Sequence, residues 1–148
     1  MSLRGLVGAS LETVTPSGRT IRRLLESADR HIAGAKVSAV SAETRFASAY
    51  TAIRMLADAG LNAHGLRVRT SVPGHHRTAI QALRHTLGLD VRTIARLDAL
   101  RRLRNLAEYS GDTVPEMAVA ECVAQAESAR IAAVEWLTSH RPEWSDGE

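Results

Sequence analysis

Aromatic residues are scarce in this sequence of 148 residues: two tryptophans, two tyrosines and one phenylalanine make up 3% of it. Alanine alone supplies 24 positions, and hydrophobic residues as a whole make up 45%. Aromatic and β-branched residues favour strands, whereas alanine and leucine favour helices. The shortage therefore excludes an all-β sandwich, and the length suits one domain whose core consists of aliphatic side chains.

Cysteine is nearly absent as well. The single thiol, Cys122, excludes an intrachain disulfide and a zinc site built from cysteines. Its neighbours Ala120, Val123 and Ala124 indicate a small buried side chain in a reducing compartment. No uncharged apolar run reaches the length of about 18 residues that a membrane span needs, and the first residues do not resemble a signal peptide. We therefore expect a cytoplasmic protein that has no membrane partner.

Lysine is also rare: the sequence has one lysine, Lys36, and 18 arginines. This preference for arginine over lysine suggests a GC-rich genome. The net charge is +3 over residues 1–60, +7 over residues 61–105 and −7 over residues 106–148. Two explanations stay open for this polarity. The basic segment would present a surface to nucleic acid, or the basic and acidic helices would pack beside each other within the fold or across a dimer.

Apolar residues recur at three- and four-residue spacing, which is the pattern of amphipathic helices. Together with glycine stop signals, the stripes predict five helices: Ile21 to Gly34, Ser41 to Gly60, Ile80 to Gly88, Val91 to Tyr109 and Thr113 to Leu137. The predicted fold is all-α, an up-and-down bundle of about five helices. We expect residues 1–16 to form a flexible N-terminal arm, residues 17–140 the bundle and residues 141–148 a polar tail.

Three details of this prediction concern helix ends and faces. Ser41 and Thr113 are expected to cap their helices, with Pro115 in the first turn of the last helix. Residues 60–74 hold three glycines and a proline and are expected to form the longest connection. The last helix is expected to turn one stripe toward the core: Met117, Ala120, Val123, Ala124, Ile131, Val134 and Leu137.

Six histidines invite a search for a metal site, but their spacing argues against one. His75 and His76 are adjacent, so they project about 100° apart on a helix, and His85 lies too far from His76 for the i, i+4 geometry. Phosphate-binding glycine loops and the Gly-x-Ser-x-Gly pattern of serine nucleophiles are missing from the sequence. We therefore predict neither a metal site nor a cofactor.

The fourth predicted helix carries an arginine on its apolar stripe. Arg104 lies in line with Leu97 and Leu100, and a buried guanidinium costs several kcal/mol unless acceptors surround it. Arg101, Asn105 and Tyr109 share a neighbouring face. Glu127 likewise lies among the apolar residues of one face of the last predicted helix. Two explanations stay open: an internal Arg104–Glu127 ion pair or a snorkelling arginine, and an arginine lining a cleft that binds phosphate or RNA.

Arg104 and Asn105 followed by Tyr109, then Ser-Gly-Asp at 110–112 and a long alanine-rich last helix, resemble the HEPN superfamily of nucleotide-binding domains. The alanine-rich segment 42–52 is similar to the second helix of that family, and the likeness spans residues 20–140. The resemblance implies a helical bundle that commonly dimerises. Active members are metal-independent endoribonucleases, in which an arginine and a histidine separated by four to six residues act across the dimer.

Tyr109 occupies the position where that histidine belongs, and no histidine occurs between His85 and His140. Tyrosine, with an ordinary pKa of about 10, is a poor general base at neutral pH. We therefore predict a non-catalytic HEPN-like homodimer that binds nucleotide, RNA or a partner protein such as a nucleotidyltransferase. Its candidate cleft residues are Arg104, Asn105, Tyr109, Arg101 and Glu108, none of them catalytic. The alternatives are a ribonuclease of a toxin-antitoxin or defence system and a helical DNA-binding regulator.

Overall fold

The computed structural model describes residues 3–111 and 113–144 and shows an all-α bundle of five helices, as predicted. The helices are α1 (Gly18–Ala35), α2 (Ala42–Ala63), α3 (His75–Thr86), α4 (Val91–Ser110) and α5 (Glu116–His140). Two short strands, β1 (Leu11–Thr13) and β2 (Leu66–Val68), and two 3-10 turns, η1 (Leu3–Leu6) and η2 (Pro142–Trp144), complete the described part of the chain.

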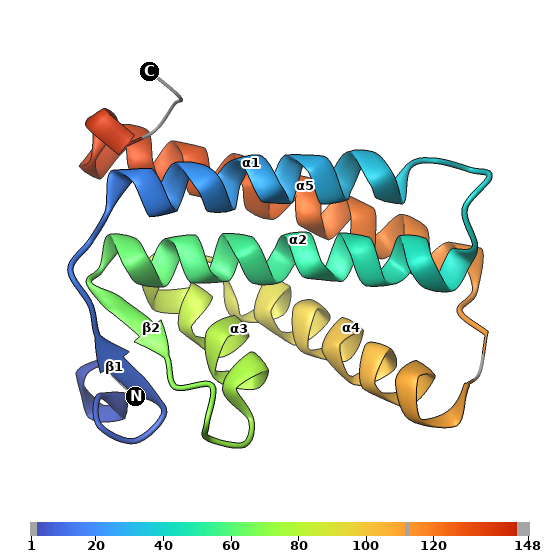
Figure 1. Cartoon of the computed structure of the whole chain (residues 1–148), viewed down its shortest axis with the longest axis horizontal. Coiled ribbons are helices and arrows are strands. Elements are labelled where there is room, and N and C mark those ends of the chain that lie inside the picture. The colour runs from blue at the N-terminus through green and yellow to red at the C-terminus, as the bar shows by residue number, and fades with distance from the viewer. Residues whose placement is uncertain (1–2, 112, 145–148) are drawn as a thin grey trace.

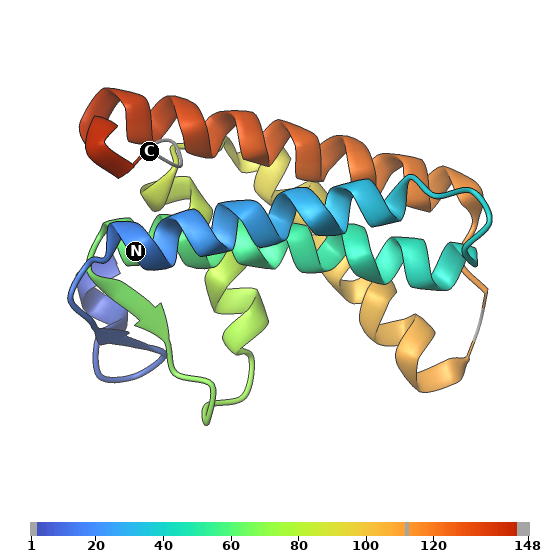
Figure 2. The same ribbon diagram turned by 45° about the horizontal axis from the view of Figure 1, so that its top comes forward.

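Helix α2 is the centre of the molecule. In Figure 1 it runs across the middle, with α1 and α5 on one side and α3 and α4 on the other, and Figure 2 shows the same order after a turn. Eleven of its residues are buried, and five of these are alanines. Because alanine side chains are short, the neighbouring helices approach α2 closely on several sides.

Local signals set most helix ends. Ser41 caps α2 as expected, because its hydroxyl accepts a hydrogen bond from the Thr44 amide at 3.2 Å. Gly111 follows α4 in the left-handed conformation, at φ 70°. Helix α5, however, begins after Pro115, whose φ of −64° suits a helix entry, so the predicted cap at Thr113 is wrong.

The N-terminal segment is part of the fold, in contrast to the flexible arm expected for residues 1–16. Strand β1 pairs antiparallel with β2, with Leu11 opposite Val68, and the Leu11 side chain is fully buried. Residues 1–2 lie outside the described part of the chain. At the other end, Trp144 packs against Gly18, and residues 145–148 lie outside the described part. The sequence did not reveal the strands because each is only three residues long.

Gly60 does not end α2, which continues to Ala63. It is instead the point of closest approach to the end of α3: a Cβ atom built at Gly60 would lie 2.9 Å from the Thr86 hydroxyl oxygen. The predicted connection over 60–74 is shortened accordingly and contains β2. Gly60 serves helix packing rather than chain reversal.

Helix α5 buries a different face from the expected one. Met117 is 85% exposed and Ile131 is 60% exposed, and Ala120 and Ala124 are exposed as well, so the stripe prediction is wrong for these four residues. The core face consists mainly of small residues: Val119, Cys122, Ala126, Ala129, Ala133 and Leu137. Short side chains let α5 lie close to α2, and the prediction that Cys122 is buried is confirmed.

Candidate functional site

Arg104 lies on the inner side of α4, in line with the buried residues Leu97 and Leu100, as its spacing predicts. Its guanidinium carbon lies 5.2 Å from the ring centroid of Tyr50 on α2, which is a cation–π contact. Only 22% of the side chain is exposed. The arginine therefore sits at the α2–α4 contact and does not extend along the surface.

Among the described residues Arg104 has one carboxylate partner, and it is not Glu127. Its Nη2 lies 3.0 Å from Oε1 of Glu108, one turn along α4. Glu127 instead pairs with Lys36 at 2.6 Å, so the predicted Arg104–Glu127 pair is wrong. Because Glu108 is 57% exposed, its pair with Arg104 contributes only about 0.3–0.5 kcal/mol and can be displaced at little cost.

The hydroxyl of Tyr50 is buried beneath this arginine and has no hydrogen-bond partner among the described residues. The Nε atoms of Arg54 and Arg104 are also buried and unpartnered within the same part of the chain. Each unsatisfied buried group costs about 1–3 kcal/mol. The three groups belong to one region, because the charges of Arg54 and Arg104 both act on the Tyr50 hydroxyl. This region therefore contains donors that no described residue satisfies.

Electrostatic effects show which charges surround the Tyr50 hydroxyl. Burial raises the pKa of Tyr50 to about 12, against the opposing positive charges of Arg54, Arg104 and Arg101. The hydroxyl therefore stays protonated and can donate a hydrogen bond at neutral pH. The three arginines come from two helices, α2 and α4, and converge on one buried side chain.

The first turn of α3 faces the same charges. Burial lowers the pKa of His76 to about 4, and the nearby charges of Arg54, His75, Arg104 and Arg101 lower it further. Gly74 precedes this helix and offers no side-chain cap, so the first amides of α3 keep their partial positive charge. We call Arg54, Arg101 and Arg104, together with Tyr50 and His76, the arginine cluster.

Carboxylates beside the arginine cluster orient its arginines. Arg101 lies 2.9 Å from Asp98, which also contacts Arg102 at 3.4 Å. Arg54 lies 4.0 Å from Asp58, and burial raises the pKa of that carboxyl group, a shift that Arg54 and His75 oppose. These contacts lie within single helices, at i, i+3 or i, i+4 spacing, so they orient side chains without joining one helix to another.

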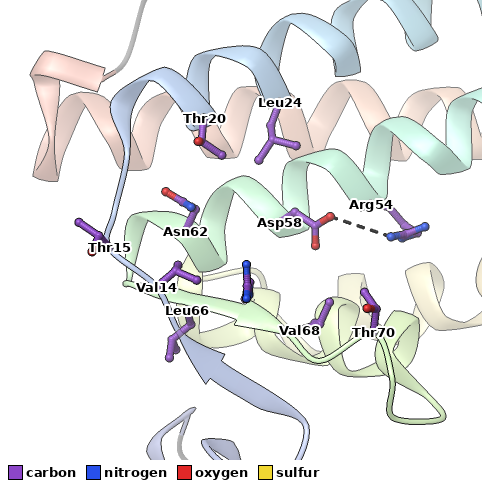
Figure 3. A pocket seen from close by; sticks show the side chains of 11 residues that line it. Val14, Thr15, Thr20, Leu24, Arg54, Asp58, Asn62, Leu66, Val68 and Thr70 are labelled. Atoms are coloured by element: carbon purple, nitrogen blue, oxygen red, sulfur yellow. Dashed lines mark ion pairs between the residues drawn. The ribbon is translucent and has the colours of Figure 1, made fainter.

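Arg54 and Asp58 also border a pocket of about 450 Å³ between α1, α2 and β2. Figure 3 shows Thr20 and Leu24 reaching into it from α1, opposite Asp58 and Asn62 on α2. A second pocket, of about 110 Å³, lies at Arg104 and has the following lining: Glu43, Phe46, Ala47, Arg104, Ala107, Glu108 and Val114. Small-molecule sites typically measure about 300–1,000 Å³, so this second space suits only a small group such as a phosphoryl group.

The structure separates the five predicted cleft residues. It brings Arg101 and Arg104 together and places Glu108 beside Arg104. Asn105 is half-buried, and its side chain makes no hydrogen bond within the described residues. Tyr109 is 91% exposed, so it does not line the arginine cluster of its own chain.

Sequence reasoning missed Tyr50, Arg54 and His76. A signal was present on α2, where Tyr50 and Arg54 are one turn apart in a helix whose other inward residues are mostly alanine and aliphatic. Their approach to α4 depends on helix packing, which local spacing does not encode.

The acidic helix α5 forms ion pairs with the first third of the chain. Glu116 and Glu127 on α5 pair with Arg45 and Lys36, not with the basic segment 61–105. Several arginines of that segment are exposed and make no ion pair within the described residues: Arg77, Arg84, Arg92 and Arg96. The positive charge of α3 and α4 is therefore not neutralised by the acidic helix.

No cluster of three or more metal-ligating side chains occurs within residues 3–111 and 113–144. In the same ranges, none of the helices combines the length and apolar character needed to cross a membrane. Comparison with protein-family models, with curated proteins and with solved structures finds no match to this chain.

Proposed function

We propose that the protein is a non-catalytic HEPN-like module that binds the phosphate group of a nucleotide or RNA at its arginine cluster. One observation carries the proposal: the charges of Arg54, Arg101 and Arg104 converge on a buried Tyr50 hydroxyl that no described residue satisfies. Guanidinium groups bind phosphate oxygens through charge-assisted hydrogen bonds. A bound phosphate would accept from the unused donors and replace Glu108 at Arg104.

The acid–base properties of the arginine cluster support binding over cleavage. Ribonuclease chemistry requires a general base and a general acid whose pKa values lie near the working pH. Tyr50, with a pKa of about 12, does not release its proton at pH 7, and His76, with a pKa of about 4, is neutral there and is only a weak base. Tyr109 lies on the surface. We therefore expect no metal-independent cleavage of RNA by the wild-type protein.

Replacement of Arg104 by methionine tests the phosphate site. Met fills the space beside Tyr50 without charge, so the fold should remain as stable or become more stable. Affinity for ribose 5-phosphate, measured by isothermal titration calorimetry, should fall about tenfold, because a charge-assisted contact contributes about 1.5–3 kcal/mol. Arg96→Met, an exposed arginine on the same helix, is the matched control and should bind normally.

Equal binding of ribose 5-phosphate by the Arg104→Met variant and the wild type would refute the phosphate site. Cleavage of single-stranded RNA in the presence of EDTA, lost in the same variant, would support the ribonuclease alternative. Affinity for duplex DNA that exceeds affinity for RNA and falls steeply with salt would support the DNA-binding regulator, through the exposed arginines of α3 and α4.

We also propose that two copies pair through α4. The outer side of this helix presents an exposed, mostly apolar stripe, interrupted by Arg102: Val91, Ala95, Ala99, Leu106 and Tyr109. Tyr109 is 91% exposed and Leu106 is 57% exposed, and contiguous apolar surface of this kind marks interaction sites. The stripe lies on the helix that carries Arg104, so pairing would bring two arginine clusters onto one dimer.

Leu106→Glu tests the interface, because a charge in its centre is unfavourable to bury. Light scattering coupled to size exclusion should give twice the mass of the chain for the wild type and the single mass for Leu106→Glu. Ile131→Glu, on the exposed side of α5, is the control and should remain dimeric. A monomeric wild type at micromolar concentration, or dissociation by the control alone, would contradict pairing through α4.

A further inference from the structure

Both tryptophans of the chain lie at one end of the bundle, away from the arginine cluster. This end is where α1 begins and where α2 and α5 finish, on the left in Figures 1 and 2. Trp136 belongs to the last turns of α5, and Trp144 to η2. The sequence has only five aromatic residues (Phe, Trp and Tyr), and two of them lie together at this end of the bundle.

Trp136 forms a stack with two histidines. The ring of His140 lies nearly parallel to it, with centroids 4.4 Å apart and an angle of 12° between the planes. The ring of His64, at the end of α2, lies 4.8 Å away at an angle of 41°. Both histidines are exposed, whereas Trp136 is half-buried. The stack therefore runs from the core outward and offers ring surface to solvent.

Hydrogen bonds hold both histidine rings in place and fix their tautomers. His64 donates from Nε2 to the Thr86 carbonyl oxygen at 3.0 Å, and His140 donates from Nδ1 to the Trp136 carbonyl oxygen at 2.9 Å. In each neutral ring the other nitrogen is then an acceptor. The exposed rings thus combine a flat surface with an acceptor at the edge.

A pocket of about 460 Å³ opens beside the stack, and the described residues that line it include no carboxylate: Pro16, Ala63, His64, Trp136, His140 and Arg141. Arg141 brings a positive charge to the rim, and its guanidinium carbon lies 5.1 Å from the Trp144 ring centroid. Trp144 is in turn held against Gly18 at the start of α1. We call these six lining residues the aromatic pocket.

We propose that the aromatic pocket is a second binding site, which takes a nucleobase together with its adjoining phosphate. The base would stack on the exposed histidine rings, its exocyclic amine would donate to a ring nitrogen, and Arg141 would bind the phosphate. Stacking on aromatic side chains with a basic residue beside them is a common way to bind single-stranded nucleic acid and nucleotides. This site is independent of the proposed phosphate site at the arginine cluster.

Intrinsic fluorescence reports on the aromatic pocket, because the chain has only two tryptophans: Trp136 lines the pocket, and Trp144 contacts its residue Arg141. Titration of the full chain with AMP should quench this fluorescence in a saturable manner, whereas ribose 5-phosphate, which lacks a base, should not. His140→Ala and Arg141→Ala should each weaken AMP binding about tenfold. His85→Ala, an exposed histidine on α3, is the control and should bind AMP as the wild type does.

The Arg104→Met variant separates the two sites. It should bind AMP at the aromatic pocket with unchanged affinity while it binds ribose 5-phosphate about tenfold more weakly. Oligoadenylate that binds more tightly than AMP, with the same loss in His140→Ala, would identify a single strand as the ligand; equal affinities would identify the free nucleotide. AMP and oligoadenylate that both fail to quench, or AMP binding that His140→Ala leaves unchanged, would overturn the aromatic pocket and leave the phosphate site standing.

Discussion

The two sides of α2 use charge in different ways. On the side of α1 and α5, ion pairs join elements that are far apart in sequence: Lys36 to Glu127 at 2.6 Å, Arg45 to Glu116 at 2.6 Å and Asp29 to Arg130 at 2.8 Å. On the side of α3 and α4, the pairs of Arg101 and Arg104 stay within one helix. The first set links the helices to one another, whereas the second leaves its arginines able to exchange partners.

The two sides of α2 also differ in how many side chains they bury. The α1–α2–α5 side is lined by fully buried side chains such as Ile21 on α1 and Cys122 on α5. Helix α4 buries only Ile94, Leu97 and Leu100, and its last turns expose Leu106 and Tyr109. The comparison teaches that the α1–α2–α5 side holds the interhelical ion pairs and most of the buried side chains, whereas the arginine cluster lies on the α3–α4 side. The following substitutions test that division.

The largest difference should appear when a leucine is shortened on each side. Leu56 on α2 is fully buried, so Leu56→Ala should lower the free energy of unfolding by about 2–5 kcal/mol. Leu103 on α4 is only half-buried, so Leu103→Ala should cost about 1 kcal/mol. Urea unfolding followed by circular dichroism measures both. Equal losses would show that α4 contributes to the core as much as α2 does.

A smaller effect of opposite sign is expected at the arginine cluster. Tyr50→Phe removes a buried hydroxyl that has no partner among the described residues, so stability should rise by about 1 kcal/mol. Ribose 5-phosphate should bind more weakly to this variant, because one donor is lost. Thermal melting and calorimetry on the same sample provide the two readouts. A destabilised variant with unchanged affinity would mean that the hydroxyl serves the fold.

The smallest effect is a pH dependence from His76. Its pKa of about 4 in the folded protein lies below the ordinary value of 6.5, so the unfolded chain binds this proton more readily. The stability is present above pH 6.5 and is lost as the pH falls toward 4. Solvent screens the half-exposed ring, so the loss is on the order of 1 kcal/mol.

His76→Gln should flatten the melting temperature between pH 6.5 and 4 relative to the wild type. Asp58 acts in the opposite direction, because its raised pKa favours the folded state at low pH, but it is common to both proteins. The difference between the two melting curves therefore isolates His76. Parallel curves would show that the ring is not held neutral beside the arginines.

Local chemistry explains what the sequence predicted well. Ser41 and Gly111 mark helix ends through their own hydrogen bonding and backbone freedom, which depend on few neighbours. The inner position of Arg104 followed from its spacing to Leu97 and Leu100. The buried face of α5 could not be predicted in this way. Alanines occur on every side of that helix, so its sides are nearly equal in hydrophobicity.

The arginine cluster could be predicted only in part for a related reason. Arg101 and Arg104 belong to one helix, but Tyr50 and Arg54 come from a helix about fifty residues earlier, and His76 from a third. Which side chains meet there depends on how closely α2, α3 and α4 pack. No spacing within a single helix carries that information.

The contact between Gly60 on α2 and the end of α3 affects the position of the whole α3 helix. It touches α3 at Thr86, the last residue of the helix, while His76 stands at the opposite end, ten residues or about 15 Å away. A helix held at one end acts as a lever, so a displacement of a few tenths of an ångström that tilts α3 at Thr86 grows along its length. A side chain at position 60 would push the end of α3 away from α2. Because Gly60 has none, the position of α3, and with it the distance of His76 from the arginines of α2 and α4, depends on this glycine.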